Sequence, residues 1–207
     1  MSRRSGRGLD CRSSRPNGSD IVVWPFGKSK AAEQRRRAAV TYVADASSEP
    51  DESDVAWLAA AAGDGDIDRA RWELRYARRV FALLVAERDA LDDRTGSLVA
   101  REMRQALQMD RSVAAGMVGL AERQLNQRLA YFRTTFSERP GTEATDARLA
   151  RVFLDRVGVR DVSGNASRAA AIVRRYIEAS QDALRAAFGV AEVPEDQPPS
   201  VWAKRPG

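Results

Sequence analysis

The sequence contains no histidine and a single cysteine, Cys11. Histidine is the commonest general base, pH switch and metal ligand in proteins, so its absence removes much of the usual apparatus for catalysis. One cysteine cannot form an internal disulfide or a zinc site, and Cys11 has no histidine to activate it as a nucleophile. We therefore expect a cytoplasmic protein from a reducing compartment, with no metal, no other cofactor and no enzymatic activity.

The sequence also lacks long hydrophobic runs. Its two longest apolar stretches are residues 55–62 and 80–86, whereas a helix that spans a bilayer needs about 20 apolar residues. Residues 21–24 are too short for the apolar region of a secretory signal, and Pro25 follows them directly. We therefore expect neither a transmembrane helix nor a secretory signal.

Lysine is scarce, and the charges are arranged in blocks. Three of the 34 basic residues are lysines, so 31 are arginines. This bias is typical of a GC-rich coding sequence and weakens arginine clusters as evidence for nucleic-acid binding. Residues 24–44 hold five basic residues and one acid, whereas residues 45–68 hold eight acids and no basic residue. The acidic segment is expected to fold against basic helices or to repel nucleic acid locally.

The two ends of the chain differ in composition from its middle. Residues 1–23 have no periodic apolar pattern and predict a disordered leader. Two interpretations of it stay open: it is a natural tail, or the natural protein begins at a GTG codon for Val22 or Val23. Residues 190–207 contain four prolines and predict a flexible tail. Between them we expect one helical domain over residues 24–189, with a basic helix at 28–44, the acidic segment at 45–68 and a core bundle at 68–188.

A strong helical pattern begins at Asp66. Large apolar side chains recur at spacings of three, four and seven over residues 66–91, in a stripe wide enough for a helix buried on much of its surface. The pattern returns from Asp110 or Ser112 to Phe136, so each helix would be about 40 Å long at 1.5 Å per residue. The apolar face of the second helix comprises Val113, Met117, Leu120, Leu125, Leu129, Phe132 and Phe136.

The connections between these helices predict the architecture. A short helix near 98–107, after a turn or kink at 92–97, links the two long ones, which are expected to form an antiparallel pair. Other helices are expected at 30–44 and 54–62, from Thr142 or Thr145 to Val157, and from Asn165 or Ser167 to Phe188. No strand pattern stands out. The sequence therefore predicts an all-α bundle of about five or six helices.

Two motifs that carry chemistry in other proteins are incomplete here. Asp64, Asp66 and Asp68 alternate as in a calcium-binding loop, but Arg69 and Arg75 stand where that loop needs Gly and Glu. We interpret Asp66 or Asp68 as a helix N-cap instead. The run 27–29 ends like a phosphate-binding loop, but the earlier glycine of that loop is absent.

A group of acids near residue 90 is interpreted as a solvated helix end. Its members alternate with arginines and flank a predicted turn, which does not favour an acid–base or metal site. They are Glu87, Asp89, Asp92 and Asp93.

Two segments remain as candidate binding sites. The first combines aromatic and basic residues that can contact an anionic membrane surface or the phosphates of nucleic acid: Trp24, Phe26, Lys28, Lys30, Arg35, Arg36 and Arg37. Alternatively, its aromatic residues pack on the bundle while the arginines stay solvated. The second is a candidate docking peptide formed by Pro198, Pro199 and Trp202, unless Trp202 folds back onto the body.

The wide apolar stripes motivate the functional expectation. Because some of them exceed what one bundle can bury, we expect a non-enzymatic protein that binds or scaffolds another macromolecule, a protein partner first of all, and that forms a homo-oligomer. The alternatives are nucleic-acid binding through the basic N-terminal segment and peripheral membrane association through Trp24 and Phe26.

Overall fold

Seven helices make up the described part of the chain. The computed structural model describes residues 26–90, 93–114, 116–138 and 143–189. The helices are α1 (Phe26–Ala46), α2 (Glu52–Ala62), α3 (Ile67–Asp89), α4 (Asp93–Gln108), α5 (Val118–Ser137), α6 (Thr145–Val157) and α7 (Val162–Phe188). The all-α class is confirmed. The described residues hold seven helices, one for each helical range that the sequence analysis names, where the bundle was expected to have about five or six, and they hold no strand.

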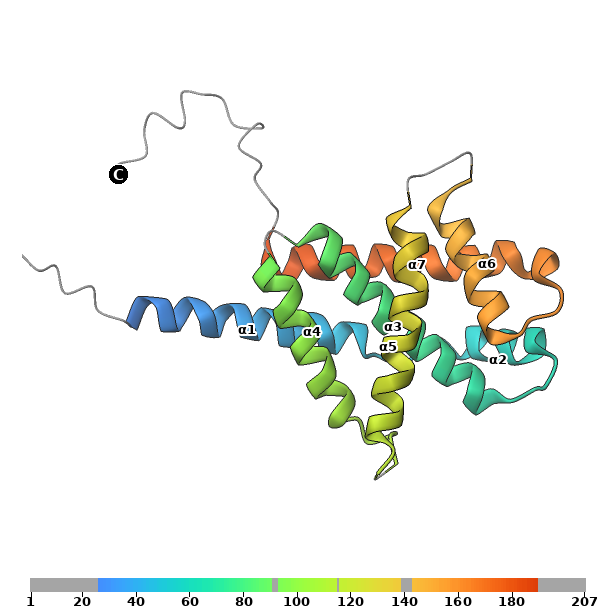
Figure 1. The fold of residues 1–207 in the computed structure, drawn as a ribbon, viewed down its shortest axis with the longest axis horizontal. Helices are drawn as coiled ribbons and strands as arrows, with labels where there is room; N and C mark the ends of the chain where they lie inside the picture. Colours follow the sequence, from blue (N-terminus) through green and yellow to red (C-terminus); the bar gives the residue numbers. More distant parts are fainter. Residues whose placement is uncertain (1–25, 91–92, 115, 139–142, 190–207) are drawn as a thin grey trace, which may run out of the picture.

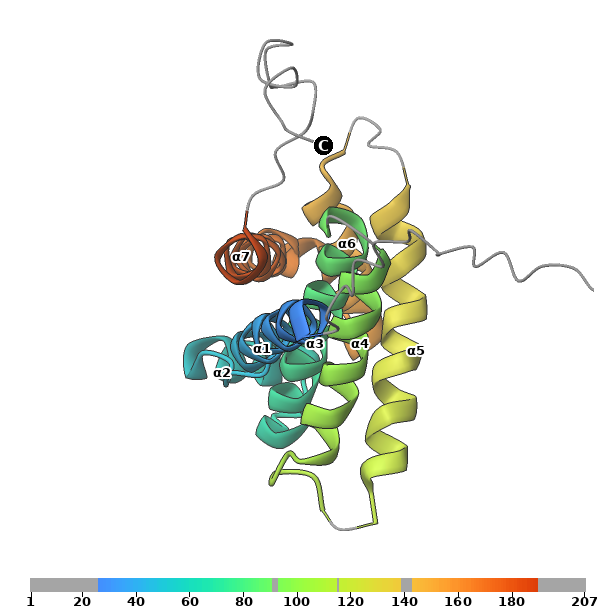
Figure 2. The ribbon, with the colours of Figure 1, turned by 90° about the vertical axis from the view of Figure 1, so that its left-hand side faces the viewer.

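Helix α3 lies at the centre of the bundle (Figures 1 and 2). It packs against α1, α2, α4, α5 and α7. All residues from 80 to 86 are buried, so no side of α3 faces solvent over two turns. This confirms the expectation of a helix buried on much of its surface. Buried side chains from all seven helices join those of α3 in one hydrophobic core.

The directions of the long helices differ from the expectation. Residues later in α3 contact residues later in α5. Tyr76 donates a hydrogen bond to Gln124, the Phe81 ring lies beside that of Phe132, and Arg88 lies over the Phe136 ring. Helices α3 and α5 are therefore parallel, because the chain reverses direction into α4 and reverses again into α5. The long helices that lie side by side in opposite directions are α1 and α7 (Figure 1).

Two expected helix starts near the α3–α5 connection are wrong. Helix α4 already begins at Asp93, within the expected turn at 92–97, and buries Thr95 and Val99. Helix α5 begins at Val118 rather than at Asp110 or Ser112. Asp110 is not a helix cap, because its carboxylate binds Ser112 and Arg79 and so anchors an irregular connection.

Helix α7 also begins earlier than expected. Its N-cap is Asp161, whose carboxylate accepts the N–H of Gly164 at 2.9 Å. A Cβ atom at residue 164 would lie 2.2 Å from the Asp161 carboxylate, so glycine is needed inside this first turn. The expected turn at 163–165 is therefore helical, and neither Asn165 nor Ser167 is the cap.

Gly158 ends α6 in a left-handed conformation, with φ of +85°. Its N–H points at the carbonyls of Leu154 and Asp155, at 3.1 and 3.0 Å. Gly158→Ala is expected to lower the free energy of unfolding by about 1 to 2 kcal/mol, since a side chain disfavours this conformation. Gly119→Ala, inside α5, is the matched control and should raise it by about 0.5 to 1 kcal/mol. Urea denaturation of both variants tests this, and equal stabilities would contradict it.

Candidate functional site

The acidic segment 45–68 is paired with arginines of α3 and α7. The ion pairs join Glu49 to Arg75, Glu52 to Arg71, Asp64 to Arg69, and Asp54 to both Arg168 and Arg175. Asp54 is buried between its two partners. The expectation that this segment folds against basic helices is thus confirmed. Much of its negative charge is cancelled locally and does not offset arginines elsewhere.

The aspartates at 64–68 serve the start of α3. Asp66 is the N-cap, as expected, and its carboxylate accepts the N–H of Arg69 at 2.9 Å. Asp64 accepts the N–H of Asp66 at 3.1 Å and the Arg69 guanidinium at 2.7 Å, and these hydrogen bonds lower the pKa of Asp64. Within the described ranges, no group of three acidic, histidine or cysteine side chains is placed to hold a metal ion.

The acids near residue 90 are solvated where the structure describes them. Glu87 pairs with Arg133 and Asp89 with Arg88, and all four residues are exposed. The interpretation as a solvated helix end is confirmed for Glu87 and Asp89. The side chains of Asp92 and Asp93 lie outside the described part.

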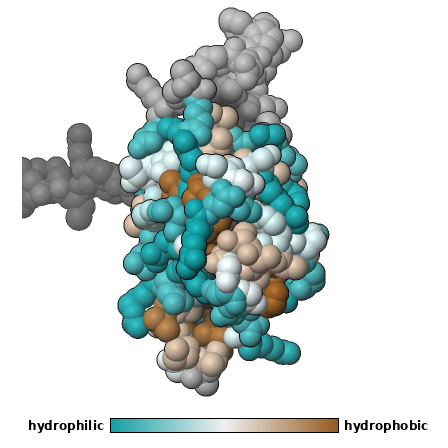
Figure 3. Space-filling view, turned by 90° about the vertical axis from the view of Figure 1, so that its right-hand side faces the viewer, coloured by the Kyte–Doolittle hydropathy of each residue, from teal (hydrophilic) through white to brown (hydrophobic). Residues whose placement is uncertain are grey.

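An exposed apolar surface lies where α4 connects to α5. It comprises the exposed Met109, Met117 and Leu120 and the partly buried Val113, and we call it the α4–α5 apolar surface. Met109 is 76% exposed, Met117 47% and Leu120 37%. Figure 3 shows hydrophobic atoms gathered at the lower end of the molecule, where this connection lies in Figure 1.

The sequence placed three of these residues on the buried face of a long helix. That expectation is wrong for Met117 and Leu120, which are exposed, whereas Val113 packs partly buried against the core but outside the helix. Residues 109–114 and 116–117, the described part of the connection, are not helical, and Gly116 has a φ of +84°. Helix α5 therefore begins too late to carry Val113 and Met117 within its regular turns. Gly116 directly before Met117 was the available signal, because glycine inside a helical pattern often marks a break.

A pocket of about 240 Å³ opens beneath the α4–α5 apolar surface. Trp72 and Tyr76 of α3 form one wall. The opposite wall and rim comprise Ser112, Val113, Ala114, Met117, Leu120, Ala121 and Gln124. None of these lining residues is acidic, basic or a cysteine, so the pocket suits an apolar side chain rather than acid–base chemistry.

The walls of this pocket are held in place by polar contacts. The Tyr76 hydroxyl donates to Gln124 Oε1 at 2.8 Å, and its ring centroid lies 5.4 Å from that of Trp72. The guanidinium of Arg128 stacks 4.4 Å from the Tyr76 ring and forms an ion pair with Glu73. Burial raises the pKa of Tyr76 although Arg128 opposes this, so the hydroxyl remains a hydrogen-bond donor at neutral pH.

A buried ion pair anchors the α4–α5 connection to α3. Arg79, which is 2% exposed, reaches Asp110 Oδ2 with Nη2 at 2.5 Å. The backbone N–H of Ser112 donates to the same carboxylate at 3.0 Å. Burial alone would raise the pKa of Asp110, but the hydrogen bonds from Ser112 and Arg79 outweigh it and hold this pKa below the usual value. The apolar surface is therefore carried by an ordered connection.

Two cations beside the apolar surface have no acidic partner. Arg111 lies in the connection and Arg123 one turn beyond Leu120 on α5. Neither makes a hydrogen bond or an ion pair with any residue that the structure describes. Both guanidinium groups are exposed and can meet carboxylates of a bound molecule.

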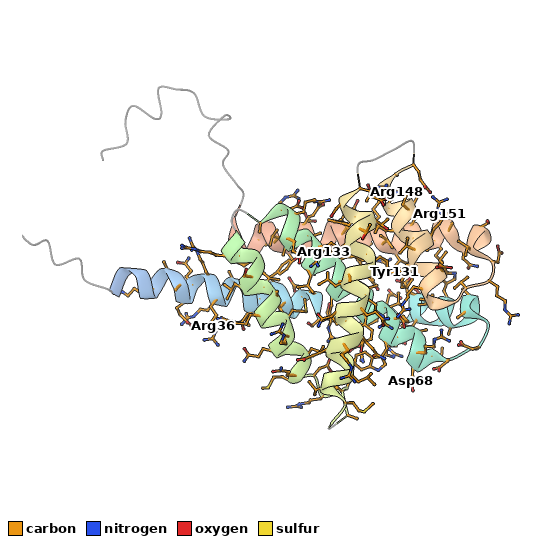
Figure 4. The ribbon with its side chains drawn as sticks, in the orientation of Figure 1. Arg36, Asp68, Tyr131, Arg133, Arg148 and Arg151 are labelled. Atoms are coloured by element: carbon orange, nitrogen blue, oxygen red, sulfur yellow. The ribbon has the colours of Figure 1, made fainter. Side chains whose placement is uncertain are left out.

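The basic part of the predicted N-terminal site lies on α1. Lys30, Arg35, Arg36 and Arg37 are all exposed, and Figure 4 shows Arg36 on α1 beside α4. Phe26 and Lys28 belong to the first turn of α1, but their side chains are outside the described part, as is Trp24. Whether the aromatic residues pack on the bundle therefore stays a prediction. The docking peptide of Pro198, Pro199 and Trp202 also lies outside the described residues.

Comparison with known proteins adds no family. No protein-family model, curated protein or solved structure matches this chain. None of the helices in the described ranges combines the length and the hydropathy needed to cross a bilayer.

Proposed function

We propose that this protein is a non-enzymatic cytoplasmic binding or scaffold protein whose partner docks on the α4–α5 apolar surface. The observation that carries the proposal is the exposure of Met109, Met117 and Leu120 above a preformed apolar pocket. Exposed apolar groups that gather around a pocket mark interaction sites, and methionine adapts readily to the shape of a partner. The absence of histidine and of charged groups in the pocket favours binding over catalysis.

The charges beside the surface favour a different protein over a second copy of this chain. If two copies met through this surface about a two-fold axis, each would bring Arg111 and Arg123 to the same interface. Like charges at such an interface are unfavourable. A partner with an apolar side chain for the pocket and acidic residues around it satisfies both features.

The test is affinity capture from native lysate with matched variants. Met117→Glu places a charge in the pocket mouth, and Val40→Glu places the same charge on α1 at an equal exposure of 47%. We expect the wild type and Val40→Glu to capture the same protein and Met117→Glu to lose it, with all three equally folded by circular dichroism. Equal recovery with Met117→Glu would place the partner elsewhere.

Homo-oligomer formation is a separate part of the proposal. It would use a surface other than the α4–α5 apolar surface. Light scattering at micromolar concentration should give a mass above that of one chain, and a strict monomer would contradict it. Membrane association through Trp24 and Phe26 predicts liposome binding that is lost when both are replaced by Ala.

A further inference from the structure

Helices α1 and α4 together carry a dense group of cations. They are Lys30, Arg35, Arg36, Arg37, Arg94, Arg101 and Arg104, and we call this the α1–α4 basic surface. With Lys28, the two helices hold eight basic residues and four acids, which are Glu33, Asp45, Asp93 and Glu102. The basic groups therefore outnumber the acids by two to one.

Several of these cations have no partner among the residues that the structure describes. Lys30, Arg35, Arg94 and Arg104 make no hydrogen bond or ion pair with any residue in the described ranges. The other described cations without a hydrogen bond or an ion pair to a described residue are Arg111, Arg123 and Arg160. An arginine-rich coding bias would spread such groups evenly, whereas here all but Arg160 lie on α1, on α4, in the α4–α5 connection or in the first two turns of α5.

Glu102 of α4 forms ion pairs with one arginine of α1 and one of α4. It is buried, and its Oε1 lies 2.8 Å from Arg101 Nη2 and 3.7 Å from Arg36 Nε. One carboxylate thus lies between guanidinium groups from both helices and neutralises one of them at most. The surface is fixed by the packing of α1 on α4 and keeps an excess of positive charge.

The N-terminal half of α1 is open to a large ligand. Every residue from 30 to 37 is exposed, and Figure 1 shows this part of α1 extending beyond the rest of the bundle. A helix that is polar all round gains little from packing, so these residues are available to a partner.

The side chains of this surface favour phosphate groups over other anions. Residues 30–37 contain alanine, glutamine, glutamate and cations but no large apolar residue. A membrane-surface helix needs an apolar face, and a protein interface needs apolar or aromatic anchors at its centre. Nucleic acid needs neither, because its backbone binds through cations alone, and arginine matches phosphate with paired hydrogen bonds.

We propose that the α1–α4 basic surface binds the phosphate backbone of nucleic acid without base specificity. This site is separate from the α4–α5 apolar surface and stands whether or not a protein docks there. Because binding releases counterions from the backbone, its affinity must fall with salt, by about 0.9 in log K per unit of log salt for each phosphate contacted.

Fluorescence anisotropy of the full chain with a labelled DNA duplex of about 24 base pairs at about 50 mM salt tests this. The variant is Arg35→Glu with Arg104→Glu, since neither side chain makes a hydrogen bond or an ion pair with a described residue. We expect affinity to fall by about 100-fold and the salt slope to shrink by about 2, as for the loss of two phosphate contacts. The control is Arg156→Glu with Arg160→Glu, two exposed positions on α6 and directly after it, and should change little. Helix α6 lies at the opposite end of the molecule from the start of α1 in Figure 1.

Three results would overturn the proposal. In the first, the wild type binds neither the duplex nor a single strand. In the second, the variant and the control lose the same affinity for the duplex. In the third, the wild type binds another polyanion more tightly than it binds DNA. The competing polyanions are phosphatidylserine vesicles and poly-glutamate, measured at the same salt. Residues 1–23 contain five arginines that could also bind DNA, and they are the same in the variant and in the control. Because both proteins reverse two positive charges outside that segment, a difference between them cannot come from those five arginines.

Discussion

Phe132→Ala is expected to lower the free energy of unfolding by about 3 to 5 kcal/mol. The Phe132 side chain is buried on α5, and its ring centroid lies 5.2 Å from that of Phe81 on α3. Truncation removes this contact and leaves a cavity between the central helix and α5, which also carries the rim of the pocket. Urea denaturation followed by circular dichroism at neutral pH measures the loss.

The neighbouring aromatic residue provides the control for this prediction. Tyr131 is exposed on the same helix turn, and its hydroxyl donates to Asp155 at 3.3 Å on the surface (Figure 4). Tyr131→Ala should therefore cost less than about 1 kcal/mol. Similar losses for the two variants would mean that α5 does not pack on α3 through Phe132.

The existence of the helices could be predicted from the sequence, but several of their starts could not. Spacings of three and four located α3 because its wide apolar stripe matches a helix buried on many sides. Asp110 and Ser112 have the side chains of helix caps, yet they bind each other in an irregular connection, where Asp110 also binds Arg79. Gly164 suggested a break but allows Asp161 to cap α7. In each case a tertiary or local contact decided between roles that the residue type leaves open.

The candidate sites were predictable to different degrees. Arg35 to Arg37 stand together in the sequence and were recognised directly. Arg94, Arg101 and Arg104 join them because α4 packs on α1, a contact that no local pattern encodes. The α4–α5 apolar surface was missed because Met117 and Leu120 continue the spacing of the buried residues that follow them. Periodicity alone does not separate an apolar residue in the core from one beside a pocket.

Asp110→Ala is expected to lower the free energy of unfolding by about 3 to 5 kcal/mol, because it leaves the buried Arg79 without its acid. Nε and Nη1 of Arg79 already have no hydrogen-bond partner among the described residues, so the carboxylate is the main compensation for burying this charge. Removing both charges in Arg79→Met with Asp110→Ala should recover most of the loss, since a well-packed apolar side chain avoids the desolvation cost. A double variant as unstable as Asp110→Ala would show that the connection, rather than the unpaired charge, causes the loss.

The ion pair between Arg79 and Asp110 also predicts how the stability of the fold changes in acid. The pKa of Asp110 is lowered in the folded protein, so the stability that it provides is present above the usual aspartate pKa of about 3.9 and is lost as the pH falls through the folded value. The stability gap between the wild type and Asp110→Ala should therefore be widest near neutral pH and narrow in acid. Asp110 also anchors the connection that carries Met109 and Met117. Limited proteolysis near these two residues should therefore accelerate as the pH falls through the folded pKa of Asp110. A gap that does not change with pH would show that the carboxylate acts through packing and not through its charge.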